Sequence, residues 1–142
     1  MKVFDLMSES VVSVGANEPI VAAARLLKKY NVGALPVCDD KGKLKGVVTD
    51  RDIAVRCVAG GLVPTRARVS DIMTRGAVTV EENTYIGDAA RIMAQAQIRR
   101  LPVTKDGALV GMLSLADLAR NTDCDSEASE ALCEISKNVR HL

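Results

Sequence analysis

The residues best suited to chemistry in this sequence are a hydroxyl and an aspartate three positions apart. They occur in "GVVTDRDIA" as Thr49 and Asp52, and again in "GMLSLADLA" as Ser114 and Asp117. At the start of a helix this spacing is a capping box, in which each side chain satisfies a backbone N–H. Such a carboxylate can also accept hydrogen bonds from the two hydroxyls of a ribose, as an acid does in dinucleotide-binding folds. The residues alone leave both interpretations open.

Other reactive side chains are scarce. The cysteines Cys38, Cys57, Cys124 and Cys133 form no C-x-x-C pair and match no zinc spacing, and the one histidine is His141. We expect reduced, structurally inert thiols, with a redox role for Cys38 as the alternative. Without a nucleophile–base pair, a Walker motif or G-x-G-x-x-G, the sequence predicts neither an enzyme nor a metal site.

Composition narrows the class of protein further. A chain of 142 residues has room for one or two small domains. The net charge of +1 gives no electrostatic footprint for nucleic acid. No apolar run approaches the roughly 18 residues of a membrane span, and the N-terminus lacks the pattern of a signal peptide. We therefore expect a cytoplasmic protein that binds neither nucleic acid nor membrane.

The chain contains one unit written twice. Residues Val3–Asp40 align with Val69–Asp106, and after omission of Lys41 the alignment continues to the two alanines that end the quoted motifs. The triplet Leu-Pro-Val at Leu35–Val37 recurs at Leu101–Val103. Two units this alike should fold alike and pack with approximate two-fold symmetry. We predict units at 1–62 and 63–122, followed by a helical tail at 123–142.

Each unit has the pattern of an α+β fold with element order β-α-β-β-α. A brief extended piece precedes an amphipathic helix, with apolar residues at i, i+3, i+4 and i+7 from Ile20 and from Ile86. Two strands joined by a polar turn follow, "ALPVC" with "LKGVVT" and "RLPVT" with "LVGMLS". The last helix starts at the hydroxyl–aspartate motif. We expect this double unit to form a two-fold symmetric module.

Smaller signals complete the expected fold. Asn17 and Asn83 are placed to cap the first helix of each unit. Pro36 and Pro102 cannot donate to a β-ladder and therefore predict a strand start or an edge strand. In the tail, the apolar residues Ala128, Ala131, Leu132 and Ile135 have helical spacing. This stripe is narrow, so the tail folds back on the module, packs on a partner or frays.

The motifs "GALPV…GVVTDRD" and "RRLPV…GMLSLAD" resemble the cystathionine-β-synthase (CBS) domain family, as a tandem pair. The resemblance covers about residues 1–122. The chain is similar to stand-alone bacterial CBS pairs, among them the mycobacterial hypoxic response protein group. It implies a pseudo-symmetric Bateman module, often dimeric. It also implies adenosine-nucleotide binding in the cleft between the two units.

The resemblance assigns nucleotide-binding roles residue by residue. The ribose-binding acids fall on Asp52 and Asp117, with hydroxyl neighbours Thr49 and Ser114. The pairs that flank the adenine fall on Ser13, Val14, Thr79 and Val80. The residues before Leu-Pro-Val, which meet phosphate when they are basic, are Arg99 and Arg100 in one unit and Gly33 and Ala34 in the other.

Arg51 adds a further asymmetry between the units. Its counterpart is Ala116, and a cation in the first turn of a helix is disfavoured by the helix dipole. An anionic neighbour is therefore expected beside Arg51, whether Asp50, a partner subunit or a phosphate. We expect the two clefts to be inequivalent.

The function favoured is a regulatory module that binds and senses AMP, ADP or ATP and needs no cofactor. The alternative is a structural or partner-binding protein whose nucleotide pocket is empty. The resemblance further implies a homodimer and leaves room for a separate regulated protein.

Overall fold

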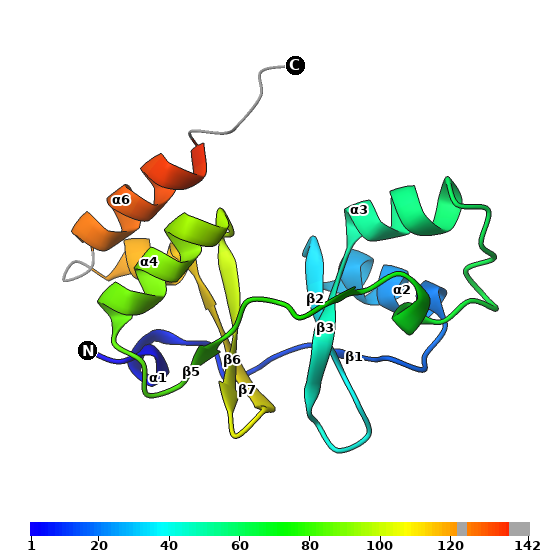
Figure 1. Ribbon diagram of the computed structural model, residues 1–142, viewed down its shortest axis with the longest axis horizontal. Coiled ribbons are helices and arrows are strands. Elements are labelled where there is room, and N and C mark those ends of the chain that lie inside the picture. The colour runs from blue at the N-terminus through cyan, green and yellow to red at the C-terminus, as the bar shows by residue number, and fades with distance from the viewer. Residues whose placement is uncertain (122–124, 137–142) are drawn as a thin grey trace. The chain divides into compact units, whose positions relative to one another are not determined.

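The computed structural model describes residues 1–121 and 125–136. The chain divides into two compact units. The first-repeat unit comprises Val12–Ala77 and Gly107–Leu109, and the second-repeat unit comprises Met1–Val11, Val78–Asp106 and Val110–Leu142. Figure 1 traces the chain through both units. The chain has the mixed α+β fold class that the sequence predicts, with the expected β-α-β-β-α order in each repeat.

The first-repeat unit is built on a four-stranded sheet of order β1-β2-β3-β4. Strand β1 is parallel to β2, whereas β2, β3 and β4 pair antiparallel. Its elements in chain order are β1 (Val14–Gly15), α2 (Ile20–Tyr30), β2 (Ala34–Cys38), β3 (Leu44–Thr49), α3 (Asp50–Asp52), the π-helix η1 (Ile53–Val58), the 3₁₀-helix η2 (Val69–Asp71) and β4 (Thr74–Arg75).

The second-repeat unit has a three-stranded sheet of order β5-β6-β7. Its elements are α1 (Val3–Leu6), β5 (Val80–Glu81), α4 (Ile86–Ala96), β6 (Arg100–Lys105), β7 (Ala108–Ser114), α5 (Leu115–Arg120) and α6 (Asp125–Ser136), the start of β7 lying in the first-repeat unit. Both cores are aliphatic, because the sequence offers almost no aromatic residues to fill them.

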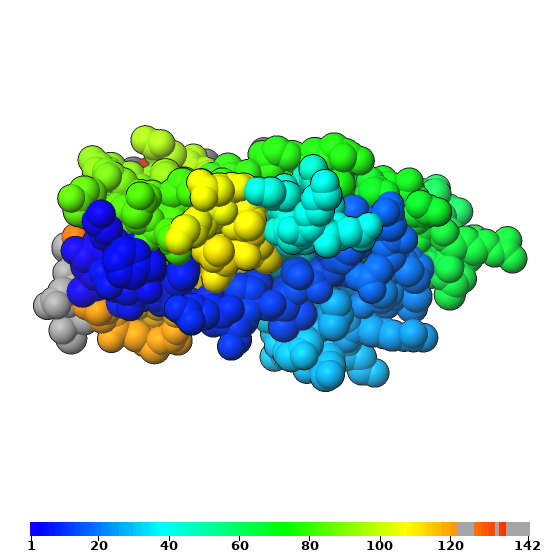
Figure 2. Space-filling view, turned by 90° about the horizontal axis from the view of Figure 1, so that it is seen from below, coloured from blue at the N-terminus to red at the C-terminus, as the bar shows by residue number. Residues whose placement is uncertain are grey.

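The opening turns of the two repeats are exchanged between the compact units. Helix α1 packs on the second repeat, where the backbone N–H of Val3 donates to the Thr84 carbonyl at 2.9 Å. Helix η2 packs on the first repeat, where the N–H of Val69 donates to the Glu18 carbonyl at 2.9 Å. The dark blue N-terminal segment lies on the surface in Figure 2. The boundaries 1–62 and 63–122 remain our proposal for the repeats along the sequence.

Asn17 and Asn83 do not cap the first helices, and this prediction was wrong. Helices α2 and α4 begin later, with Pro19 and Tyr85 at the N-cap position and no side-chain cap. The helix N–H groups are satisfied by backbone carbonyls from distant segments: Ile20 bonds to Ala67, Val21 to Pro64 and Ile86 to Met1. A tertiary contact therefore replaces the local side chain.

Pro36 lies inside a central strand rather than at a start or an edge. It is paired with Val47 in the middle of β2, and β2 has neighbours on both sides. A proline is tolerated there because β1 pairs only with Val37 and Cys38. The ladder of β1 thus ends before it reaches the residue that lacks an N–H.

The described part of the tail, residues 125–136, folds back on the second repeat. Helix α6 packs against α4 and α5 and buries Ala128, Ala131 and Ile135 in the core of that unit. Leu132, the fourth residue of the predicted stripe, stays 46% exposed. Among the helices of residues 1–121 and 125–136, none has the length and apolar character needed to cross a bilayer.

Candidate functional site

Both hydroxyl–aspartate pairs form reciprocal capping boxes, so the capping interpretation is confirmed. Thr49 Oγ1 accepts from the Asp52 N–H at 3.0 Å, and Asp52 Oδ2 accepts from the Thr49 N–H at 2.9 Å. The corresponding distances for Ser114 and Asp117 are 3.1 and 2.8 Å. Each helix therefore starts with two of its orphan N–H groups satisfied.

The second oxygen of each carboxylate faces an arginine about one helical turn further along the chain, on η1 for Asp52 and on α5 for Asp117. Asp52 Oδ1 lies 3.7 Å from Arg56 Nε, and Asp117 Oδ1 is bonded to Arg120 Nη2. The Arg56 guanidinium also donates to the Ile72 carbonyl at 3.2 Å. Sequence reasoning missed both arginines, although their spacing of four and three residues from the aspartate was a usable signal. A ribose would have to share these carboxylates with the guanidinium groups.

The start of each central strand is tied to the start of the capped helix. The Leu115 N–H donates to the Arg99 carbonyl at 2.8 Å, and the Asp50 N–H donates to the Gly33 carbonyl at 3.0 Å. Residues that precede Leu-Pro-Val are therefore held beside the capping box in both repeats. The fold thus brings together two of the predicted motifs.

In the second repeat these motifs border a hollow of about 410 Å³. Its lining combines two arginines, a hydroxyl and small apolar side chains: Arg99, Arg100, Ser114, Leu115, Ala116 and Ala119, with Ala128, Ser129 and Leu132 from α6. This volume lies within the roughly 300–1,000 Å³ range of small-molecule sites. In the described part of the chain, neither Arg99 nor Arg100 has a side-chain hydrogen bond or ion pair. Both charges are therefore available to an anion.

The first repeat differs at the equivalent positions. Gly33 and Ala34 carry no charge, and Asp50 Oδ2 lies 3.4 Å from the point where a Cβ on Gly33 would stand. Asp50 Oδ1 accepts from the backbone N–H of Arg51 at 2.8 Å, so a carboxylate lies beside the backbone of that residue. The Arg51 side chain itself is exposed. A carboxylate thus occupies the place where the second repeat presents two arginines.

The hydroxyl–valine pairs lie at the short parallel strands. Val14 and Val80 are buried core residues paired with Val37 and Val103, so only their backbone is available to a ligand. Thr79 is half-buried and Ser13 is exposed. Neither pair belongs to the described lining of the 410 Å³ hollow, and neither does Asp117. Their roles toward a nucleotide remain predictions.

Cys38 lies beside Ser13 at the end of β2. Burial raises the pKa of the Cys38 thiol, a hydrogen bond with Ser13 opposes this shift, and Asp39 adds to it. A thiol with a raised pKa is a poor nucleophile at neutral pH. This supports the inert interpretation of Cys38.

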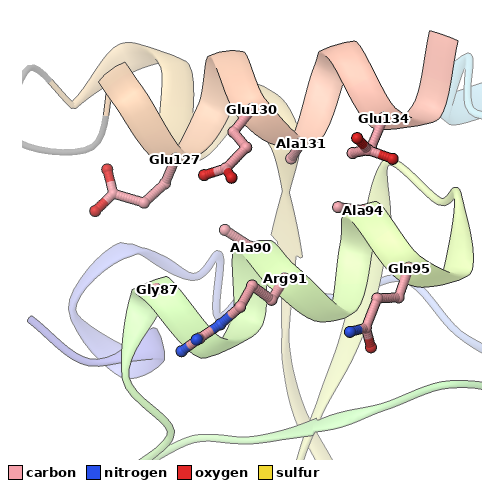
Figure 3. A pocket seen from close by; sticks show the side chains of 9 residues that line it. All are labelled: Gly87, Ala90, Arg91, Ala94, Gln95, Glu127, Glu130, Ala131 and Glu134. Carbon is pink, nitrogen blue, oxygen red and sulfur yellow. The ribbon is translucent and has the colours of Figure 1, made fainter. Parts of the chain in front are cut away.

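A smaller hollow, of about 230 Å³, is lined by residues of α4 and α6. Figure 3 shows Glu127, Glu130 and Glu134 on α6 turned toward α4, which carries Arg91 and Gln95. Arg91 is already paired with Asp88. This hollow is below the usual size of a ligand site. Across residues 1–121 and 125–136, no three His, Cys, Asp or Glu side chains are grouped to hold a metal ion.

Two β-α-β-β-α repeats, each with a capped strand-to-helix junction, define a tandem α+β module. The chain belongs to the CBS domain family, whose model matches residues 3–58 and 69–122. Its relatives include the CBS domain-containing protein YhcV of Bacillus subtilis, which is 43% identical over 96% of both chains. Hypoxic response protein 1 of Mycobacterium tuberculosis is 37% identical over 82% of both chains.

Solved structures of CBS proteins have the same fold. A structure of Hypoxic Response Protein I with two coordinated zinc ions matches with a TM-score of 0.79 at 36% identity, covering 85% of this chain and 98% of that one. The CBS pair of MJ0100, in complex with 5′-methylthioadenosine and S-adenosyl-L-methionine, matches at 0.72 and 30% identity, covering 84% and 94%. CBSX2 in complex with AMP matches at 0.72 and 31% identity, covering 84% and 93%.

Proposed function

We propose that this protein is a regulatory module that binds an adenine nucleotide, with AMP as the first candidate. The observation that carries the proposal is the hollow of the second repeat, where Arg99 and Arg100, which have no ion-pair partner among the described residues, lie beside Ser114. The ligands named for MJ0100 and CBSX2 support the chemical class, because AMP, methylthioadenosine and S-adenosylmethionine share an adenosine group. Binding rather than catalysis is proposed, and it requires no cofactor.

Within this site the two arginines bind the phosphate. Guanidinium groups hold phosphate through charge-assisted bonds, which are worth about 1.5–3 kcal/mol each. Ser114 and Asp117 remain the proposed ribose partners, with Asp117 sharing its carboxylate between the ribose and Arg120. The backbone at Thr79 and Val80 is the proposed neighbour of the adenine.

The first repeat is proposed as the weaker or empty site for a phosphorylated nucleotide. Asp50 stands against Gly33, so a phosphate there would meet a carboxylate at the place where the second repeat has Arg99 and Arg100. An adenosine derivative without a phosphate would avoid this repulsion. Ser13, Val14, Ala34, Thr49, Arg51 and Asp52 are the residues that would form this site.

Calorimetric titration with AMP and with 5′-methylthioadenosine tests the proposal. Arg99→Ala and Arg100→Ala should each lower the affinity for AMP by roughly 10- to 100-fold, since each removes one charge-assisted contact. The same variants should bind methylthioadenosine with nearly unchanged affinity, because this ligand has no phosphate. Arg25→Ala, an exposed arginine on α2, is the matched control.

Asp117→Asn and Asp52→Asn then locate the ribose. Loss of binding in the first variant alone would assign the ligand to the second repeat. If no adenine nucleotide binds the wild-type protein, the alternative of a ligand-free, partner-binding CBS protein would stand. The side-by-side placement of Asp50 and Gly33 favours that alternative for the first repeat.

We also propose that the protein is cytoplasmic and forms a homodimer through its CBS repeats. Light scattering after size-exclusion chromatography measures the oligomeric state. A dimer would elute at twice the 15.1 kDa mass of the chain. A monomer at micromolar concentration would refute this part of the proposal without affecting the ligand site.

A further inference from the structure

Helix α6 is more than a tail that covers the core. Its buried face, formed by Ala128, Ala131 and Ile135, packs against α4 and α5. A neighbouring face borders the hollow that holds Arg99 and Arg100, to which it contributes Ser129 and Leu132. One helix therefore contacts both the core and the candidate ligand site.

Leu132 is the residue whose position needs a reason. It is a large apolar side chain that is 46% exposed, whereas Ala128, Ala131 and Ile135 on the same helix are buried. The hollow that Leu132 lines is also lined by the cationic residues Arg99 and Arg100. A cavity with an apolar wall and a cationic end fits a ligand that has a flat apolar group and an anionic end.

We propose that α6 forms one wall of the ligand site, so that nucleotide binding and the docking of α6 on the second repeat stabilise each other. This inference rests on the proposed function. Leu132 and Ala128 provide apolar contact to the adenosine group, the hydroxyl of Ser129 lies within the same wall, and the arginines bind the phosphate. Aliphatic side chains thus provide the apolar contact to the ligand in a region of the sequence that has no aromatic residues.

The consequence is a regulatory output. Because coupling between two equilibria is reciprocal, a ligand that binds more tightly when α6 is docked must also hold α6 in place. The ligand would therefore change how often the outer face of α6 is presented as an ordered helix.

The test uses the 142-residue chain and AMP. Leu132→Ala should lower the affinity for AMP by about tenfold, because the substitution removes much of the apolar contact of one leucine. Glu130→Ala is the matched control, since Glu130 lies on the same helix but lines the smaller hollow against α4. Its affinity for AMP should be that of the wild type. Hydrogen exchange of the α6 amides in the wild type should slow when AMP is bound.

Two results would overturn the inference. AMP affinity that is unchanged or tighter in Leu132→Ala, with exchange in α6 insensitive to AMP, would show that α6 is not a wall of the site. If Arg100→Ala still weakens AMP in that case, the proposed function survives and only the role of α6 is lost. Absence of AMP binding to the wild type would remove both. Should Leu132→Ala fail to fold, the exchange measurement on the wild type decides.

Discussion

The backbone N–H of Leu115 donates to the carbonyl of Arg99 at 2.8 Å, and this bond joins the start of α5 to the residue before β6. It places a guanidinium-bearing segment beside the Ser114–Asp117 capping box. The first repeat has the same bond between Asp50 and Gly33. The geometry of the two repeats is therefore shared, while the charge that they present is opposite.

Removal of the capping hydroxyl should destabilise the second repeat. Ser114→Ala leaves the Asp117 N–H without its 3.1 Å acceptor, and the loss of such a cap costs about 1 kcal/mol. Urea denaturation followed by circular dichroism measures this change. Thr65→Ala, an exposed hydroxyl in the segment between the repeats, should stay within the error of the wild type. Equal stability of Ser114→Ala and the wild type would contradict the capping role.

Arg56 and Arg120 should differ in their contribution to stability, although both face a capping aspartate. The Arg56 guanidinium also donates to the Ile72 carbonyl, so Arg56→Ala should cost about 1–2 kcal/mol. Among the described residues, the side chain of Arg120 pairs only with Asp117, and exposed ion pairs contribute roughly 0–1 kcal/mol. The two variants can be compared by the same urea titration. An equal or larger loss in Arg120→Ala would show that the carbonyl contact is unimportant.

The elements that the sequence predicted well are those with local signals. Strands β2 and β3 have the expected bounds, since apolar runs flank a polar turn. The capping boxes were recognisable because both partners lie within four residues of each other. The repeat itself made each signal visible twice.

The features that the sequence did not reveal depend on residues far apart in the chain. The carbonyls of Ala67 and Met1 cap α2 and α4, and no window around those helices contains them. Likewise, the apolar stripe of α6 predicted a helix but not the surface on which it packs. The hollow beside Arg99 could not be predicted, because one of its walls comes from that helix.

The glycine that opens each quoted motif has a packing explanation that can be tested. A Cβ on Gly46 would collide with the backbone carbonyl of Thr74 on the adjacent strand β4. Gly46→Ala should therefore cost about 1–3 kcal/mol, as overpacked sites do. Gly87 on α4 has nothing within 4 Å of its Cβ position, so Gly87→Ala should instead stabilise the protein by about 0.5–1 kcal/mol. Thermal and urea unfolding that moved both variants in one direction would refute this account.

The raised pKa of Cys38 predicts how stability changes at alkaline pH. Burial favours the neutral thiol in the folded state, so the folded protein holds this proton at pH values where the unfolded chain has released it. The contribution is complete below the thiol pKa of the unfolded chain, about 8.5, and is lost progressively as the pH rises above it. As the pH rises from neutral to alkaline values, the free energy of unfolding should therefore fall more steeply for the wild type than for Cys38→Ala.

Ser13 provides the opposing test of the same thiol. Its hydrogen bond lowers the pKa of Cys38 against the effect of burial, so Ser13→Ala should raise that pKa further and slow alkylation of Cys38 by iodoacetamide. Mass spectrometry of the peptide that contains Cys38 gives the alkylation rate as a function of pH. Because only the thiolate reacts, faster alkylation in Ser13→Ala at a fixed pH below the thiol pKa would mean that Ser13 does not stabilise the thiolate, provided that urea denaturation shows the fold to be as stable as in the wild type.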